Sequence, residues 1–236
     1  MSDVSALQRA VSRRYAALGL PSWPDPWPDR IPDDAAYSRV TGPERYRVLL
    51  RRADAWVEEL TRADGVEGVE GWRVVVEEVP VLELAGELAE GERVWAGRFA
   101  RARRLSNDRP GTQPLLLLEQ EDPVPMLRMA LASADAVLEQ QPDCGCDACD
   151  SGSEDLLLVV DRVFVEVLTG PVVVLRGRDA GGGQWSAVWS REWRSAGGAP
   201  GAPDFHDLMA RCARLAAGED VELPAGTRSW VSQPWL

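Results

Sequence analysis

The sequence lacks lysine, since each of its 26 basic side chains is an arginine. A Walker A loop binds phosphate with a lysine, Schiff-base and pyridoxal enzymes react through one, and protein kinases hold ATP with one. The absence of lysine therefore excludes all four kinds of active site within this chain.

Histidine is nearly absent as well, and His206 is its single occurrence. Any Ser-His-Asp or Cys-His arrangement would have to use this residue, and the chain contains neither a G-x-S-x-G nor an H-E-x-x-H motif. The sequence thus contains no familiar catalytic constellation, which favours a non-enzymatic protein.

Long apolar runs are also missing, because Asp161, Arg162 and Glu166 interrupt the most apolar stretch before it reaches the ~18 residues of a membrane span. The opening residues MSDVSALQRA lack the basic and apolar pattern of a secretory signal. We therefore expect a cytoplasmic protein. In the cytoplasm thiols stay reduced, so clustered cysteines indicate a metal or catalytic site before a disulfide.

The formal net charge is -12 and the sequence pI is about 4.7. An acidic surface repels phosphate backbones and anionic lipid headgroups, so neither nucleic acid nor a membrane is expected as a partner. One basic run stands out, and we interpret it as a solvated strand face rather than a polyanion-binding patch: Arg98, Arg101, Arg103 and Arg104.

The chain of 236 residues is long enough to bury one core, and its patterns predict a single α+β domain with an antiparallel sheet flanked by helices. Thr41 with Glu44 predicts a capping box for the second helix, and Ser153 predicts a cap for the third. Apolar residues at three- and four-residue spacing predict four helices with these inward-facing sets: Val4, Leu7, Val11, Tyr15, Leu18; Tyr46, Leu49, Ala53, Trp56, Leu60; Leu156, Val160, Val163, Val167; Phe205, Leu208, Cys212, Leu215.

Strand patterns occupy the segments between these helices. The spacing of Trp185, Trp189 and Trp193 predicts one sheet face or core ladder rather than a platform for sugars or bases. Residues 124–138 carry a helical stripe, although Pro123 and Pro125 favour an extended start. The predicted strands are 72–79, 93–104 and 113–120, with a hairpin at 107–112, followed by a second hairpin of 171–177 and 183–190.

A proline-rich stretch, PSWPDPWPDRIPDD, separates the first two helices. It predicts an extended arm near the N-terminus that lies over the core with Trp23 and Trp27 as anchors, and the alternative is a motif for a proline-binding partner. We therefore assign residues 1–36 to an N-terminal helix and arm packed on the core, and residues 37–236 to the α+β domain.

Three of the four cysteines stand in CGCDACD, residues 144–150. Cys146 and Cys149 have a C-x-x-C spacing that lets one turn present two sulfurs to a metal, and Gly145 permits a bend that adds Cys144. A structural zinc usually has four ligands. His206 is the first candidate for the fourth, and the others are Asp147, Asp150 and Cys212, of which Cys212 lies on an apolar stripe and is interpreted as core.

Two other interpretations of the block stay open: a redox pair, and a tight turn with half-buried thiols. The acids Asp143, Asp147 and Asp150 raise thiol pKa values and disfavour free thiolates, whereas a divalent cation deprotonates thiols itself. The acids therefore favour a metal over a redox pair. The turn interpretation also fits the sequence, because aspartate and serine are common turn residues and the block contains Asp147, Asp150 and Ser151.

Three segments, YSRVTGPERY (37–46), CGCDACDSGS (144–153) and WVSQPW (230–235), together resemble an uncharacterised actinobacterial family of domain-of-unknown-function proteins. The resemblance implies a single domain and singles out the cysteine block. It also implies an extended conformation before the block, against the helical stripe of residues 124–138. No activity comes with it.

Two functional hypotheses follow from the sequence. The first is a non-enzymatic accessory or interaction protein with a protein partner, stabilised by a structural zinc or a cysteine-rich turn. The second is a thiol- or zinc-dependent enzyme with the cysteine block as its active site.

Overall fold

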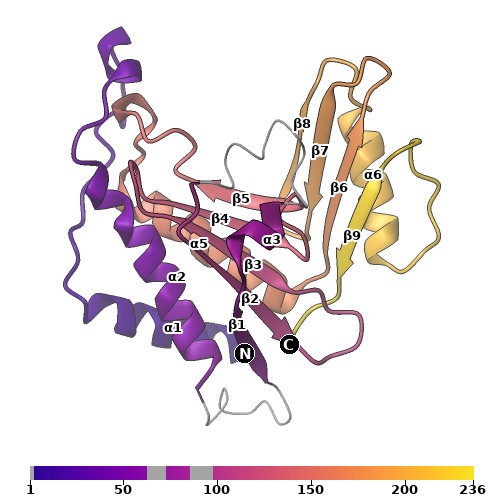
Figure 1. Ribbon diagram of the computed structural model, residues 1–236, viewed down its shortest axis with the longest axis horizontal. Coiled ribbons are helices and arrows are strands. Elements are labelled where there is room, and N and C mark those ends of the chain that lie inside the picture. Colours follow the sequence, from indigo (N-terminus) through magenta and orange to yellow (C-terminus); the bar gives the residue numbers. More distant parts are fainter. Residues whose placement is uncertain (1–2, 63–72, 86–97) are drawn as a thin grey trace.

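The computed structural model describes residues 3–62, 73–85 and 98–236. Within these ranges two antiparallel sheets carry the helices, which confirms the predicted α+β class and single domain. Figure 1 shows α1 (Asp3–Ala16), α2 (Arg47–Leu60) and α5 (Gly152–Thr169) beside the larger sheet, and α6 (Phe205–Ala216) on the outer face of the smaller one. The boundary drawn at residue 36 stays a prediction.

The larger sheet has the order β1-β2-β3-β4-β5, and every neighbouring pair is antiparallel. The predicted strand 113–120 and the hairpin at 107–112 are confirmed, and residues 73–79 of the predicted strand 72–79 contain β1. Residue 72 and residues 93–97 of the predicted strand 93–104 lie outside the described residues, and β2 begins only at Arg101. The strands of the larger sheet are β1 (Val74–Glu78), β2 (Arg101–Asn107), β3 (Leu115–Gln120), β4 (Met126–Leu131) and β5 (Val137–Gln141).

The helical stripe predicted for residues 124–138 is wrong, because this stretch contains β4 and the start of β5. All residues of β3 and β4 are buried, since α2 and α5 pack on one face of the sheet while α3 (Val81–Ala85) and Phe99 pack on the other. A strand that is buried on both faces needs no alternation of polar and apolar residues, so its sequence is easily mistaken for a helix.

The smaller sheet has the order β8-β7-β6-β9, again antiparallel. The predicted hairpin is formed by β6 (Val172–Arg178) and β7 (Gln184–Trp189), with β8 (Arg194–Gly198) and β9 (Arg228–Ser232) at the edges. On α6, Leu208 and Cys212 are buried against this sheet, which confirms Cys212 as a core residue. Phe205 was predicted to face inward, but it is 41% exposed.

The three tryptophans of the β7 region do not form one ladder. Trp185 and Trp189 pack in the cluster under α6, whereas Trp193 lies beyond β7 and packs against the main core on the other side of the sheet. There the guanidinium of Arg162 lies 4.6 Å from the Trp193 ring centroid.

The predicted buried sets of α2 and α5 are confirmed, but neither predicted cap forms. A 3-10 turn, η2 (Pro43–Tyr46), precedes α2, so Thr41 lies too far from its first turn, and α5 already begins at Gly152, before Ser153. The Thr41 hydroxyl donates to Asp147, and the Ser153 hydroxyl contacts Trp23. Long-range partners therefore replace the local caps.

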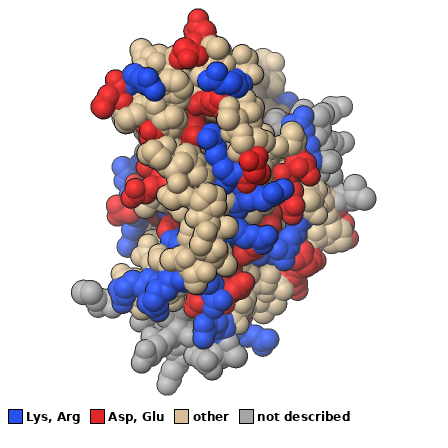
Figure 2. Space-filling model, turned by 90° about the vertical axis from the view of Figure 1, so that its left-hand side faces the viewer, with Lys and Arg blue, Asp and Glu red and all other residues tan. Residues whose placement is uncertain are grey.

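The basic run on β2 is not simply a solvated face. Arg101 forms an ion pair of 2.5 Å with Glu78, whereas Arg103 is buried and pairs with Glu119 and, at 3.0 Å, with Asp54. Figure 2 shows basic and acidic side chains interspersed over the face that carries α1 and α2, rather than gathered by sign. 

The C-terminal segment joins the two sheets. Trp235 is only 1% exposed, and its Nε1 donates to the carbonyl of Gln113 before β3 at 3.2 Å. Its backbone N–H donates to the carbonyl of Val167 at the end of α5, at 3.3 Å. One core thus extends from α1 to the end of the chain.

Candidate metal centre

The cysteine block lies in the loop between β5 and α5, which contains the short 3-10 helix η3 (Asp147–Cys149). Gly145 adopts φ 74°, and a Cβ at this position would lie 2.8 Å from Cγ1 of Val124. Both the backbone conformation and the close approach therefore require glycine. The bend at Gly145 brings Cys144 back beside Cys146, as the spacing predicts.

The Sγ atoms of Cys144, Cys146 and Cys149 lie within 4.8 Å of one another, so the three sulfurs can hold one metal ion. The Sγ atoms of Cys144 and Cys146 are 3.1 Å apart. Tetrahedral zinc with Zn–S bonds of about 2.3 Å separates its sulfur ligands by roughly 3.8 Å, so the Cys144 and Cys146 sulfurs would move apart by about 0.7 Å to bind it. Cys146 is buried, while Cys144 and Cys149 are exposed.

Contacts within the cluster shift the pKa values of Cys146 and Cys149 in opposite directions. Burial acts to raise the pKa of Cys146, but hydrogen bonds with the other two thiols and with the N–H groups of Cys149 and Ala148 lower it overall. The contacts with Cys144 and Cys146 raise the pKa of Cys149 to about 12. Ionisation is thus favoured at the buried sulfur, whereas a reactive thiol needs ionisation and solvent access in the same residue.

Asp147 anchors the loop through both its side chain and its backbone. Its carboxylate accepts hydrogen bonds of 2.7 Å from Arg39 Nε, from the Thr41 amide and from Thr41 Oγ1. Its N–H donates to the Arg39 carbonyl at 2.8 Å, and its carbonyl accepts from Trp27 Nε1 at 2.8 Å. These contacts fix η3 to two segments more than a hundred residues away in the sequence.

Asp150 is the second anchor, and its side chain is 1% exposed. It accepts hydrogen bonds from Trp23 Nε1 at 2.9 Å and from the Gly152 amide at 3.0 Å, and it pairs with Arg45 Nη2 at 2.8 Å. The Arg45 guanidinium lies 5.3 Å from the Trp23 ring centroid. Arginines therefore neutralise both carboxylates, so the cysteines have less acidic surroundings than the sequence indicates.

The environment of Asp147 has a pH-dependent consequence. The hydrogen bond from Arg39 and those from Thr41 lower the pKa of Asp147 from 3.8 to about 2, although burial acts in the opposite direction. A carboxyl whose pKa is lowered on folding stabilises the native state above its unfolded pKa, and this contribution is lost as the pH falls through the folded value.

We therefore expect Asp147→Asn to reduce the free energy of unfolding at pH 7 by on the order of 1 kcal/mol. The difference from the wild type should shrink as the pH is lowered from about 4 to about 2. Urea unfolding of both proteins across this range measures it, with the exposed Asp143→Asn as control. Parallel stability curves for Asp147→Asn and the wild type would contradict this assignment.

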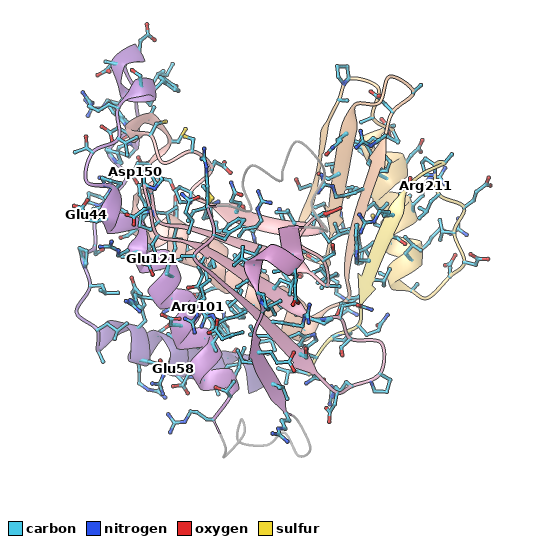
Figure 3. All side chains as sticks on the ribbon, in the orientation of Figure 1. Glu44, Glu58, Arg101, Glu121, Asp150 and Arg211 are labelled. Atoms are coloured by element: carbon cyan, nitrogen blue, oxygen red, sulfur yellow. The ribbon has the colours of Figure 1, made fainter. Side chains whose placement is uncertain are left out.

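The structure does not bring His206 to the three sulfurs. His206 is exposed on the first turn of α6, where its ring contacts Phe205. Figure 3 shows Asp150, next to Cys149, and Arg211 of α6 at opposite ends of the molecule. Within residues 3–62, 73–85 and 98–236, no histidine, cysteine, aspartate or glutamate adds a fourth ligand atom within 4.8 Å.

The other predicted ligands make different contacts in the structure. Burial in the core under α6 raises the pKa of Cys212 to about 12. Asp147 and Asp150 hold Arg39 and Arg45 instead of facing a metal. The predicted set of four is therefore reduced to three sulfurs.

Three residues that hold the loop in place were not predicted to do so from the sequence: Arg39, Thr41 and Arg45. One signal was available, because YSRVTGPERY and CGCDACDSGS are two of the three segments that carry the family resemblance. In the structure the arginines and threonine of the first segment bind the aspartates of the second.

A family model described as Family of unknown function (DUF6226) matches residues 11–235. The chain belongs to DUF6226. This confirms the resemblance to an uncharacterised domain-of-unknown-function family, and the DUF6226 match includes both the cysteine loop and its anchors. No curated protein and no solved structure matches the chain significantly. Among the described residues of this DUF6226 member, no helix has the length and apolar character to cross a membrane.

Proposed function

We propose that this protein is a non-enzymatic accessory or interaction protein that binds one zinc ion through Cys144, Cys146 and Cys149. The observation that carries the proposal is the convergence of three sulfurs on a loop held from two sides by Asp147 and Asp150. Thiolates prefer zinc and other thiophilic ions over magnesium or calcium. A cytoplasmic location fits, because a reducing compartment keeps the thiols available.

A zinc ion here has a structural task. The three cysteines lie between β5 and the first turn of α5, and the same loop holds Trp23 and Trp27 through hydrogen bonds from their indole N–H groups. Three thiolates without a cation repel one another, whereas a bound divalent ion joins them and removes their protons. Zinc would thereby stabilise the loop together with the segments anchored to it.

Elemental analysis of protein purified under reducing conditions tests the proposal, followed by chelation and a thermal melt. We expect one tightly bound zinc per chain, slow alkylation of the cysteines, and a lower midpoint temperature after chelation. A protein that binds no metal and whose cysteines are alkylated slowly would instead support a turn with half-buried thiols.

A thiol- or zinc-dependent enzyme is the second candidate, and the number of ligands favours it. Catalytic zinc sites have three protein ligands and an open position, as this cluster would. The cavity beside the loop has a volume of about 240 Å³, and none of its lining residues is a cysteine. A metal-free protein in which one cysteine is alkylated rapidly would favour the thiol enzyme.

A further inference from the structure

We propose that the metal ion takes its fourth ligand from a protein partner, through a basic segment that presents one histidine. This inference rests on the proposed function, since it requires a metal on the three sulfurs.

The open coordination position faces outward. Cys144 and Cys149 are exposed, whereas Cys146 lies on the buried side of the cluster. Of the three carboxylates next to the cysteines in the sequence, Asp143 has no oxygen within 4.8 Å of all three sulfurs. Asp147 and Asp150 could reach the metal only by giving up their arginines and the other hydrogen bonds that hold the loop. A fourth donor is therefore more easily supplied from outside.

Apolar side chains next to the loop are exposed to water. Figure 1 shows η1 (Asp34–Ser38) beside the loop that precedes α5, at one end of the molecule, and η1 lies against η3. Tyr37 of η1 is 56% exposed, and Ile31, just before it, is 88% exposed. Val40 is 45% exposed because its neighbours Arg39 and Thr41 turn their side chains to Asp147.

Scattered exposed apolar residues are normal on a protein surface. These three residues, which we call the tip surface, differ because they belong to residues 27–41, the segment that holds η3 through Trp27, Arg39 and Thr41: Ile31, Tyr37 and Val40. A small substrate would gain little from so open a surface, whereas a protein segment that crosses it can cover all three side chains.

The acidic side chains around the cysteine loop indicate which kind of partner segment would bind. The exposed acids around the loop outnumber the exposed bases, which are Arg30 and Arg39, and Arg39 is already paired with Asp147. Zinc with three thiolates carries a net charge of about -1, so a neutral imidazole adds no charge while a fourth thiolate adds another negative one. A basic segment with a histidine fits both conditions, and the exposed acids are Asp29, Asp33, Asp34 and Asp143.

The test uses the full-length protein loaded with Co²⁺, whose visible absorption reports the ligands. The probes are imidazole, the peptide Arg-Leu-His-Leu-Arg and the same peptide with alanine in place of histidine. We expect imidazole and the histidine peptide to change the spectrum, with the peptide binding at least about tenfold more tightly than imidazole. The alanine peptide should leave the spectrum unchanged.

A matched variant separates the tip surface from the metal. Ile31→Ser combined with Val40→Ser should reduce the peptide affinity towards that of imidazole and leave the imidazole affinity unchanged. Added salt should weaken the binding of the peptide but not that of imidazole, because only the peptide carries charge complementary to the acids.

Several outcomes would overturn the proposal. A cobalt spectrum that responds to no probe means that the chain fills the fourth position itself, although the metal site would stand. Equal affinity for the peptide and imidazole would show that the tip surface does not contribute to peptide binding. Metal-dependent self-association that is lost in His206→Ala identifies a second copy as the occupant. Failure to bind cobalt refutes the proposed function itself.

Discussion

Replacing Cys146 with serine is expected to abolish stoichiometric metal binding and to lower the midpoint of thermal unfolding by roughly 8–16 °C. A serine hydroxyl does not ionise at neutral pH, and Cys146 is the buried member of the cluster. A ligand present at about a thousand times its Kd stabilises the native state by about 4 kcal/mol. In a chain of this size, each kcal/mol shifts the midpoint by about 2–4 °C.

The loss of metal must be separated from damage to the core. Cys212→Ala removes the other buried thiol, in the cluster under α6, and should leave the metal content at one ion per chain. Wild-type protein treated with a chelator should melt close to the Cys146→Ser variant. If Cys146→Ser retains the wild-type metal content, the sulfur cluster is not the binding site.

Asp150→Ala should destabilise the protein by roughly 3 kcal/mol. The substitution removes a carboxylate that is 1% exposed and accepts from Trp23, Gly152 and Arg45. The guanidinium of Arg45 would keep its charge without a counterion, and two N–H groups would lose their acceptor. Denaturant unfolding, followed by the fluorescence of the tryptophans, measures the change.

Two further variants control this measurement. Asp150→Asn keeps an acceptor for Trp23 and Gly152 but lacks the charge, so its stability should fall between those of the wild type and Asp150→Ala. The exposed Asp29→Ala should change stability by less than about 0.5 kcal/mol. Equal effects of Asp150→Ala and Asp29→Ala would show that Asp150 does not anchor the loop.

Helices α2 and α5 were predictable because their buried faces have a local period. The spacing of Leu49, Ala53, Trp56 and Leu60 describes the buried side of α2, and the same reasoning holds for α5. The strand at residues 126–131 was not recognised from its sequence. Because β4 is covered on both faces, its sequence lacks the alternation of a half-buried strand. The family resemblance implied the extended conformation that periodicity missed.

The cysteine loop was only partly predictable. The spacing of Cys144, Cys146 and Cys149 with an intervening glycine is a local property, and it correctly implied that one turn brings the sulfurs together. The role of Thr41 was not predictable from its neighbours, because its partner Asp147 lies 106 positions away and replaces the local cap. The separation of α6, the helix that contains His206, from the cysteine loop is likewise a property of the tertiary fold.

X-ray absorption at the zinc edge of the zinc-loaded protein tests most directly whether the three cysteines bind one ion. If three cysteines and one outside donor bind the zinc, the spectrum should show three sulfur neighbours at about 2.3 Å and one nitrogen or oxygen neighbour at about 2.0–2.1 Å. A zinc surrounded by nitrogen and oxygen alone, or no zinc retained on the protein, would contradict it.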